Sequence, residues 1–146
     1  MMQQLVIETE VIQISIYCNI IKNILKHHKD LSLNKIMVFA YLVKKEKFLY
    51  CKIYNGNNTQ DLVSKATSLL AGEYVDYCNS SSYILKAIHL LLSNKQILIK
   101  DNLLLYKTDT MAEKVIYEEN QFLYNAIEAS KKITERQFMK EVMINV

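Results

Sequence analysis

One stretch, residues 80–107, constrains the fold more than any other part of the chain. From Ile84 to Leu92 its apolar residues recur at steps of three and four, which is the spacing of an amphipathic helix. The serines at 80–82 are expected to cap the start of this helix, and Asn94 to end it. The stretch therefore begins with a helix that packs on a core.

Two short apolar runs, 96–100 and 103–107, follow the helix. Asp101 and Asn102 lie between them, and because both residue types tolerate positive φ, the pair predicts a two-residue hairpin turn. A helix that runs directly into a β-hairpin is the second half of a winged helix. We therefore expect helix and hairpin to share one small core.

The hairpin should be apolar on the side facing the helix. Alternate strand positions share a face, so the residues expected on the helix side are Ile97, Ile99, Leu103 and Leu105. Lys100 and Lys107 are expected to stay near water.

The helix within 80–107 has too few polar positions for a DNA reader. Leu90 falls on the same face as Tyr83, Lys86 and Ser93, so the apolar surface extends almost around the helix. A recognition helix should instead offer a polar, basic face to the major groove. This pattern predicts a winged-helix-like core that another protein covers.

Length and composition fit a single domain, 1–146. Hydrophobic residues make up 51% of the chain and charged residues 23%, which favours a globular fold. The predicted class is mainly α with a small β-hairpin, a winged-helix-like domain with a long C-terminal helix. We expect N-terminal helices in 1–60, two helices and the wing in 61–107, and a helical arm in 109–146.

The charge balance does not favour sequence-specific DNA binding. Net charge is +3, and Arg136 is the one arginine among 18 basic residues, although arginine is the usual reader of bases and phosphates. The alternative, a winged-helix DNA-binding transcriptional regulator, stays open because Lys95, Lys100 and Lys107 surround the hairpin and could contact phosphates.

Apolar periodicity predicts further helices on both sides of this stretch. These cover 9–29 (capped by Thr9), 31–46 (opened by Ser32), a third from Thr59 or Asp61 to Gly72, and a last helix from 109 or 110 to about 143. The helix 31–46 is apolar nearly all round and should be central. Residues 48–55 suit a strand or an irregular connection, and 55–58 a turn.

No residue pattern predicts catalysis, a metal or a cofactor. Cys18, Cys51 and Cys78 form no CxxC pair, and neighbouring His27 and His28 diverge on a helix. Glu73 and Asp76 could share a helical face, yet solvated acids on a short helix are the simpler interpretation. With no P-loop, GxGxxG or HExxH motif either, we expect a protein that is not an enzyme.

The cysteine count and the hydropathy pattern predict a location. An odd number of cysteines and an acidic N-terminus without a basic region favour a reducing compartment. No apolar run approaches the ~18 residues that a membrane span needs. The expected protein is soluble and cytoplasmic, with no membrane contact.

Three stretches together resemble a known family. They are the very apolar segment 31–45 with its basic end, the serine step, helix and strand pair of 80–105, and the helical tail. In this order they resemble the middle-component small subunits of bacterial ABC three-component and Lamassu-type antiphage defence systems. The chain departs from the family pattern in lacking prolines in its second helix and in having Lys44-Lys45 at the tip.

The resemblance implies a non-catalytic accessory subunit, placed between an SMC-like ABC ATPase and an effector subunit of nuclease type. It supplies no catalytic residues, and non-specific DNA contact is compatible with it. The surfaces expected to meet the ATPase are the apolar faces of 31–43 and 82–92, with the last helix as a further contact. The residues expected at partner contacts are Leu33, Met37, Phe39, Leu90, Phe122 and Ile133.

Overall fold

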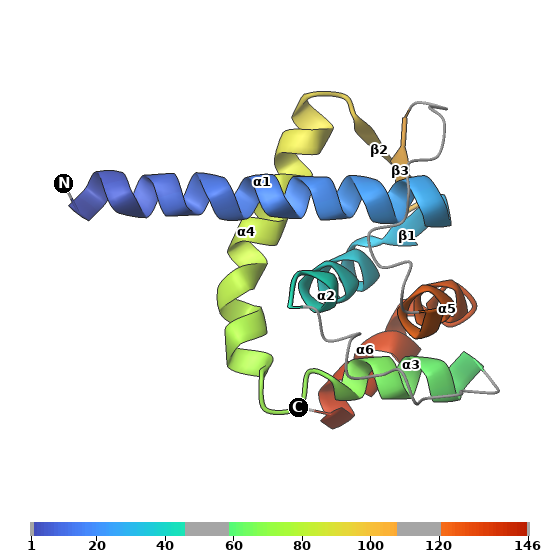
Figure 1. The fold of residues 1–146 in the computed structure, drawn as a ribbon. Helices are drawn as coiled ribbons and strands as arrows, with labels where there is room; N and C mark the ends of the chain where they lie inside the picture. Colours follow the sequence, from blue (N-terminus) through green and yellow to red (C-terminus); the bar gives the residue numbers. More distant parts are fainter. Residues whose placement is uncertain (1, 46–58, 108–120, 146) are drawn as a thin grey trace.

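The computed structural model describes residues 2–45, 59–107 and 121–145 (Figure 1). These residues are mostly helical, with one small antiparallel sheet. The strand or connection expected at 48–55, the turn at 55–58 and the start of the last helix near 110 lie outside them. In chain order the elements are α1 (Met2–His28), β1 (Asp30–Ser32), α2 (Leu33–Lys44), α3 (Thr59–Ser68), α4 (Tyr74–Ser93), β2 (Ile97–Lys100), β3 (Leu103–Tyr106), α5 (Gln121–Ser130) and α6 (Glu135–Asn145).

Helix α1 begins well before the predicted residue. Thr9 lies inside it and donates its hydroxyl to the carbonyl of Leu5, 2.8 Å away, so Thr9 is not a cap. The C-terminal half of α1 is buried, with Tyr17 and Ile21 fully inside. Figure 1 shows the N-terminal half extending beyond α4, where apolar side chains such as Val6 are exposed.

The hairpin forms as the sequence predicts and gains a third strand. Asp101 and Asn102 have φ of 53° and 64°, which confirms the two-residue turn. Strand β3 pairs with β2 on one side and with β1 on the other, both antiparallel, in the order β1-β3-β2. Leu31 and Ser32, expected in the helix 31–46, instead belong to β1, since a three-residue strand is too short to show a period of two.

The predicted facing of strand β3 is wrong by one residue. Across this two-residue turn Ile99 pairs with Leu104 and Ile97 with Tyr106, so Leu104 rather than Leu103 or Leu105 shares the face of the two isoleucines. Leu104 and Ile97 are buried, whereas Ile99 near the turn is 60% exposed. Lys100 and Lys107 are exposed, as expected.

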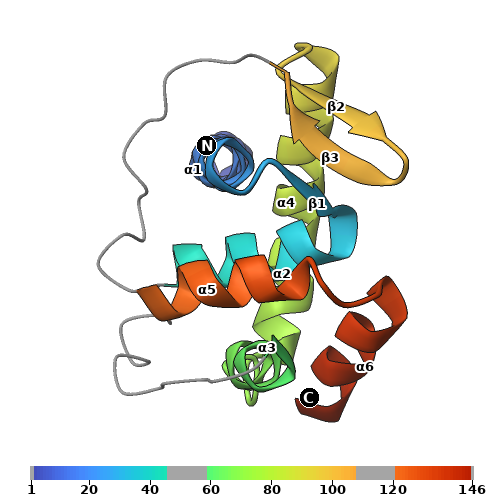
Figure 2. The same cartoon turned by 90° about the vertical axis from the view of Figure 1, so that its right-hand side faces the viewer.

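Helices α2 and α4 form the centre of the domain. Helix α2 is buried from Lys35 to Val43 and contacts α1, α4, α5 and α6. Helix α4 runs unbroken through the serines that were expected to cap it, and Ser81 donates to the carbonyl of Cys78 within the helix. Figure 2 shows the hairpin near one end of α4 and α3 near the other.

The described part of the C-terminal tail is two helices, so a single long arm is wrong for these residues. Helix α6 begins with a reciprocal N-terminal cap, in which Thr134 and Gln137 exchange hydrogen bonds of 3.0 and 3.1 Å between side chain and backbone. Both helices fold back on the domain. Phe138 of α6 is fully buried, with its ring 5.8 Å from that of Phe39 in α2.

Candidate functional site

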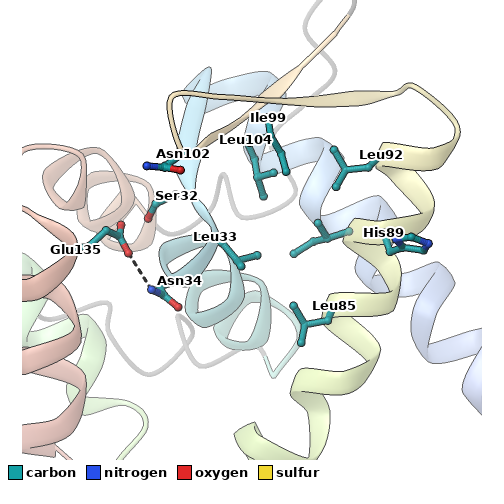
Figure 3. Close-up of a pocket in the computed structure, with 11 residues that line it drawn as sticks. Ser32, Leu33, Asn34, Leu85, His89, Leu92, Ile99, Asn102, Leu104 and Glu135 are labelled. Carbon is teal, nitrogen blue, oxygen red and sulfur yellow. Dashed lines mark hydrogen bonds between the residues drawn. The ribbon is translucent and has the colours of Figure 1, made fainter.

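A surface groove lies between α4, the hairpin and the first turn of α2 (Figure 3). Its volume is about 540 Å³, within the range of ligand-binding clefts. The apolar residues that line it are Leu33, Leu85, Ile88, Leu92, Ile99 and Leu104. In Figure 3 the labelled apolar side chains come from α2, α4, β2 and β3 and surround one hollow.

The rim of the groove exposes large apolar side chains. Leu85 of α4 is 45% exposed, Leu33 of α2 is 40% exposed, and Ile99 of β2 is 60% exposed. Ile88 beneath them is buried, so the floor belongs to the core. Single exposed leucines are ordinary on protein surfaces, but a cluster around one hollow is typical of an interaction site.

The opposite side of the groove is polar. Asn34 donates its amide to Glu135 Oε2 at 3.0 Å, which ties the start of α6 to the start of α2. Behind them Lys35 donates to the carbonyl of Ile133 at 2.8 Å, with its Nζ 3.8 Å from Glu135 Oε1. Burial lowers the pKa of Lys35, and the carboxylate of Glu135 opposes that shift.

Two polar atoms at this side have no hydrogen-bond partner in the described structure. They are the hydroxyl of Ser32, in a residue only 4% exposed, and Oε1 of Glu135. Asn102 of the hairpin turn lies beside them (Figure 3). Buried polar atoms are nearly always hydrogen-bonded, so two without partners in one groove are unusual.

The residues expected at partner contacts divide between surface and core. Leu33 lies on the groove, and Leu90, 44% exposed, lies on the outer face of α4. Met37, Phe39 and Phe122 are buried in the domain's own core, and Ile133 packs against it half-buried. Periodicity located the apolar residues of these helices, but it could not say which of them the chain buries itself.

The three hairpin lysines lie at the surface. Lys95, Lys100 and Lys107 are all exposed, and Lys95 has a φ of 60° in the tight turn after α4. The outer face of α4 adds Lys86, which forms an ion pair with Glu10 of α1.

A tyrosine joins α2 to the first turns of α4. The hydroxyl of Tyr41 donates to Asp76 at 2.8 Å and reaches Glu73 at 3.1 Å, while Lys45 pairs with Asp76 at 2.9 Å. Burial and the two carboxylates raise the pKa of Tyr41, and the donors Lys45 and Tyr41 lower the pKa of Asp76. The acids expected to be merely solvated are therefore part of a hydrogen-bonded contact between the helices.

His28, the second of the two neighbouring histidines, packs inside the domain. His28 is fully buried, its Nδ1 is 2.9 Å from Glu128 of α5, and its ring lies 4.5 Å from that of Tyr124. Burial lowers the pKa of His28, and the hydrogen bond to Glu128 works against that shift. Within the described residues no cluster of three metal-ligating side chains occurs.

Comparisons with known proteins identify no relative. No protein-family model, no curated protein and no solved structure matches the chain. In the described ranges, no helix combines the length and the apolar character that crossing a membrane requires.

Proposed function

We propose that the protein is a non-catalytic accessory subunit that binds an SMC-like ABC ATPase of an antiphage defence complex, between that ATPase and an effector subunit. The family resemblance supplies the partner, and the arrangement of elements supports the class. The order α1, β1, α2, α4, β2, β3, with the sheet order β1-β3-β2, supports the winged-helix part of this proposal, with α3 as an addition. In the proposed arrangement α4 corresponds to the recognition helix.

The observation that carries the proposal is the outer face of α4. A helix that reads DNA presents polar and basic side chains, but here Leu85 and Leu90 are 45% and 44% exposed. Between them lie Lys86, which is paired with Glu10, and the exposed His89. This face suits an apolar partner surface better than a phosphate backbone.

Co-expression with an SMC-like ABC ATPase tests the proposal. We expect the chain alone to self-associate and the ATPase to keep it in solution and co-purify with it. Leu85→Asp should abolish co-purification, because it places a charge in the interface. Leu98→Asp is the matched control: Leu98 is 43% exposed, but on the other face of the hairpin from Ile99. A well-behaved monomer without affinity for such an ATPase would contradict the proposal.

The alternative, a winged-helix DNA-binding regulator, is favoured by the exposed lysines of the hairpin. Gel-shift titration at two salt concentrations separates the two functions, since a regulator binds one duplex well above random DNA. Weak binding that falls steeply with salt and ignores sequence would fit an accessory subunit that touches the backbone.

A triple variant of the hairpin isolates its electrostatic role. Replacing Lys95, Lys100 and Lys107 together with Glu should leave the circular dichroism spectrum unchanged, since exposed substitutions usually cost little stability. If this variant assembles with the ATPase but loses DNA binding, the hairpin contacts nucleic acid. If it matches the wild type in both assays, the lysines only keep the hairpin hydrated.

A further inference from the structure

The polar side of the groove indicates what kind of segment the groove accepts. Ser32 is almost completely buried and its hydroxyl has no partner in the described structure. Leaving such a buried group unpaired is unfavourable, and a bound group that supplies a hydrogen bond would remove this cost. Oε1 of Glu135, at the same side of the groove, also lacks a hydrogen bond, although it lies 3.8 Å from the ammonium of Lys35.

The charge presented at this side is negative. The side chain of Glu135 is 44% exposed, whereas that of its counter-ion Lys35 is 7% exposed and lies behind it. The ammonium of Lys35 donates a hydrogen bond to the carbonyl of Ile133, and its Nζ lies 3.8 Å from Oε1 of Glu135, which is longer than a hydrogen bond. A bound segment would therefore meet the carboxylate of Glu135, and the complementary group is a cation that donates hydrogen bonds.

The rest of the groove is lined by apolar side chains and by His89. Leu33, Leu85 and Ile99 stand around the hollow, each at least 40% exposed, and their surfaces gain from being covered. A free cation would leave these surfaces in water, and a purely apolar ligand would leave the Ser32 hydroxyl and Oε1 of Glu135 without a hydrogen bond. The two requirements are met together by a protein segment that combines them.

We propose that the groove binds a segment of a partner protein that inserts aliphatic side chains between α4 and the hairpin and places a lysine or arginine against Glu135 and Ser32. This deepens the proposed function, and rests on it for the identity of the partner. The specificity then lies in Glu135, while the leucines supply the buried area.

Selection from a phage-displayed library of random dodecapeptides on the immobilised full chain tests this inference. We expect enriched sequences with two or more aliphatic residues and a lysine or arginine near them. Selection on Glu135→Gln should keep the aliphatic residues and lose the basic one, because glutamine keeps an acceptor for Asn34 but carries no charge. Selection on Leu85→Asp should enrich nothing above background.

A titration of one enriched peptide makes the result quantitative. Replacing its basic residue with norleucine should weaken the Kd for the wild type by about tenfold, the effect of one charge-assisted hydrogen bond. The same replacement should change the Kd for Glu135→Gln by less than about twofold. Equal losses on both proteins, or enrichment of acidic peptides, would overturn the proposal, as would tight binding of an apolar amine without any peptide.

The outcomes separate this inference from the proposed function. If the ATPase co-purifies with the wild type and not with Leu85→Asp, while the library shows no basic preference, the function stands and the role of Glu135 is wrong. If the library shows the predicted preference and no SMC-like ATPase binds, the groove recognises such a segment in a different partner. Thermal unfolding of Glu135→Gln within a few degrees of the wild type shows that a lost preference is not a lost fold.

Discussion

Helices α2 and α4 look alike in sequence and differ in the structure. Both have apolar residues around most of their circumference. Helix α2 is buried without interruption from Lys35 to Val43, whereas the buried residues of α4 are Ile84, Ala87, Ile88 and Leu91, all on one side. Similar apolar composition therefore goes with burial on all sides in α2 and with burial on one side in α4.

The difference follows from the neighbours of each helix. Helix α2 contacts α1, α4, α5, α6 and β1, while α4 contacts α1, α2 and β2 and leaves its outer face to solvent. An apolar pattern thus does not show how much of a helix its own chain buries. For α2 the chain is sufficient, and the case for a partner rests on α4 and the groove beside it.

The largest expected effect comes from the core of α2. Phe39→Ala should lower the free energy of unfolding by about 3–5 kcal/mol, because it leaves a cavity beside the ring of Phe138. Chemical denaturation followed by circular dichroism measures this change. A loss below about 1 kcal/mol would mean that Phe39 is not tightly packed in the core, contrary to the burial of α2 described above.

A smaller effect is expected where the two helices meet. Tyr41→Phe removes the hydroxyl that donates to Asp76 and lies 3.1 Å from Glu73, and should cost about 1–2 kcal/mol, since hydrogen bonds to charged groups are among the stronger ones. The ring and its packing remain, so the co-purification assay should be unaffected. If the variant lost binding as well, the outer face of α4 would depend on this contact.

The same contact should weaken in acid. The pKa of Asp76 lies below its ordinary value of 3.8 because Lys45 and Tyr41 donate to the carboxylate. As pH falls through this region the unfolded chain binds a proton before the folded chain does, so this part of the stability is complete above pH 3.8 and is lost below it. Unfolding midpoints between pH 5 and pH 3 should fall less steeply for Asp76→Asn than for the wild type. Equal slopes would show that the contact does not contribute.

The smallest effect on stability is expected on the outer face of α4. Changing Leu85 and Leu90 to Ser should alter the free energy of unfolding by about 0.5 kcal/mol or less each, because both side chains are already largely in water. The double variant should be more soluble and more monodisperse than the wild type in light scattering. A loss comparable to that of Phe39→Ala would place these leucines in the core.

Much of the fold could be predicted from local sequence. The periodicity of 84–92 and the Asp101-Asn102 pair located α4 and the hairpin, and apolar density identified α2 as central. The features that were predicted wrongly depend on residues far away in the sequence. Strand β1 forms because β3 pairs with it. The side chains of β3 that face the helix are set by its register with β2, which an apolar run such as Leu103-Leu104-Leu105 does not reveal. The break before α6 had a visible signal, the Thr134 and Gln137 pair, which the apolar stripe concealed.

The candidate site was only partly predictable. Leu33, Leu90 and Phe39 are all expected at partner contacts because they are apolar. Only Phe39 is buried in the structure, and the sequence offers no means of telling the three apart. Glu135 and Ser32 are separated by about a hundred residues and meet only because α6 folds back on the start of α2. No local sequence pattern predicts that residues so far apart in the chain line the same groove.

Hydrogen–deuterium exchange with and without an SMC-like ABC ATPase tests the central claim most directly. We predict that the ATPase slows exchange in peptides covering 82–93 and 97–100, where the groove and the outer face of α4 lie. Peptides covering 35–43 should change little, because α2 is already buried in the free chain. Slowed exchange confined to 35–43, or to the exposed N-terminal half of α1, would contradict the assignment of the partner surface to α4.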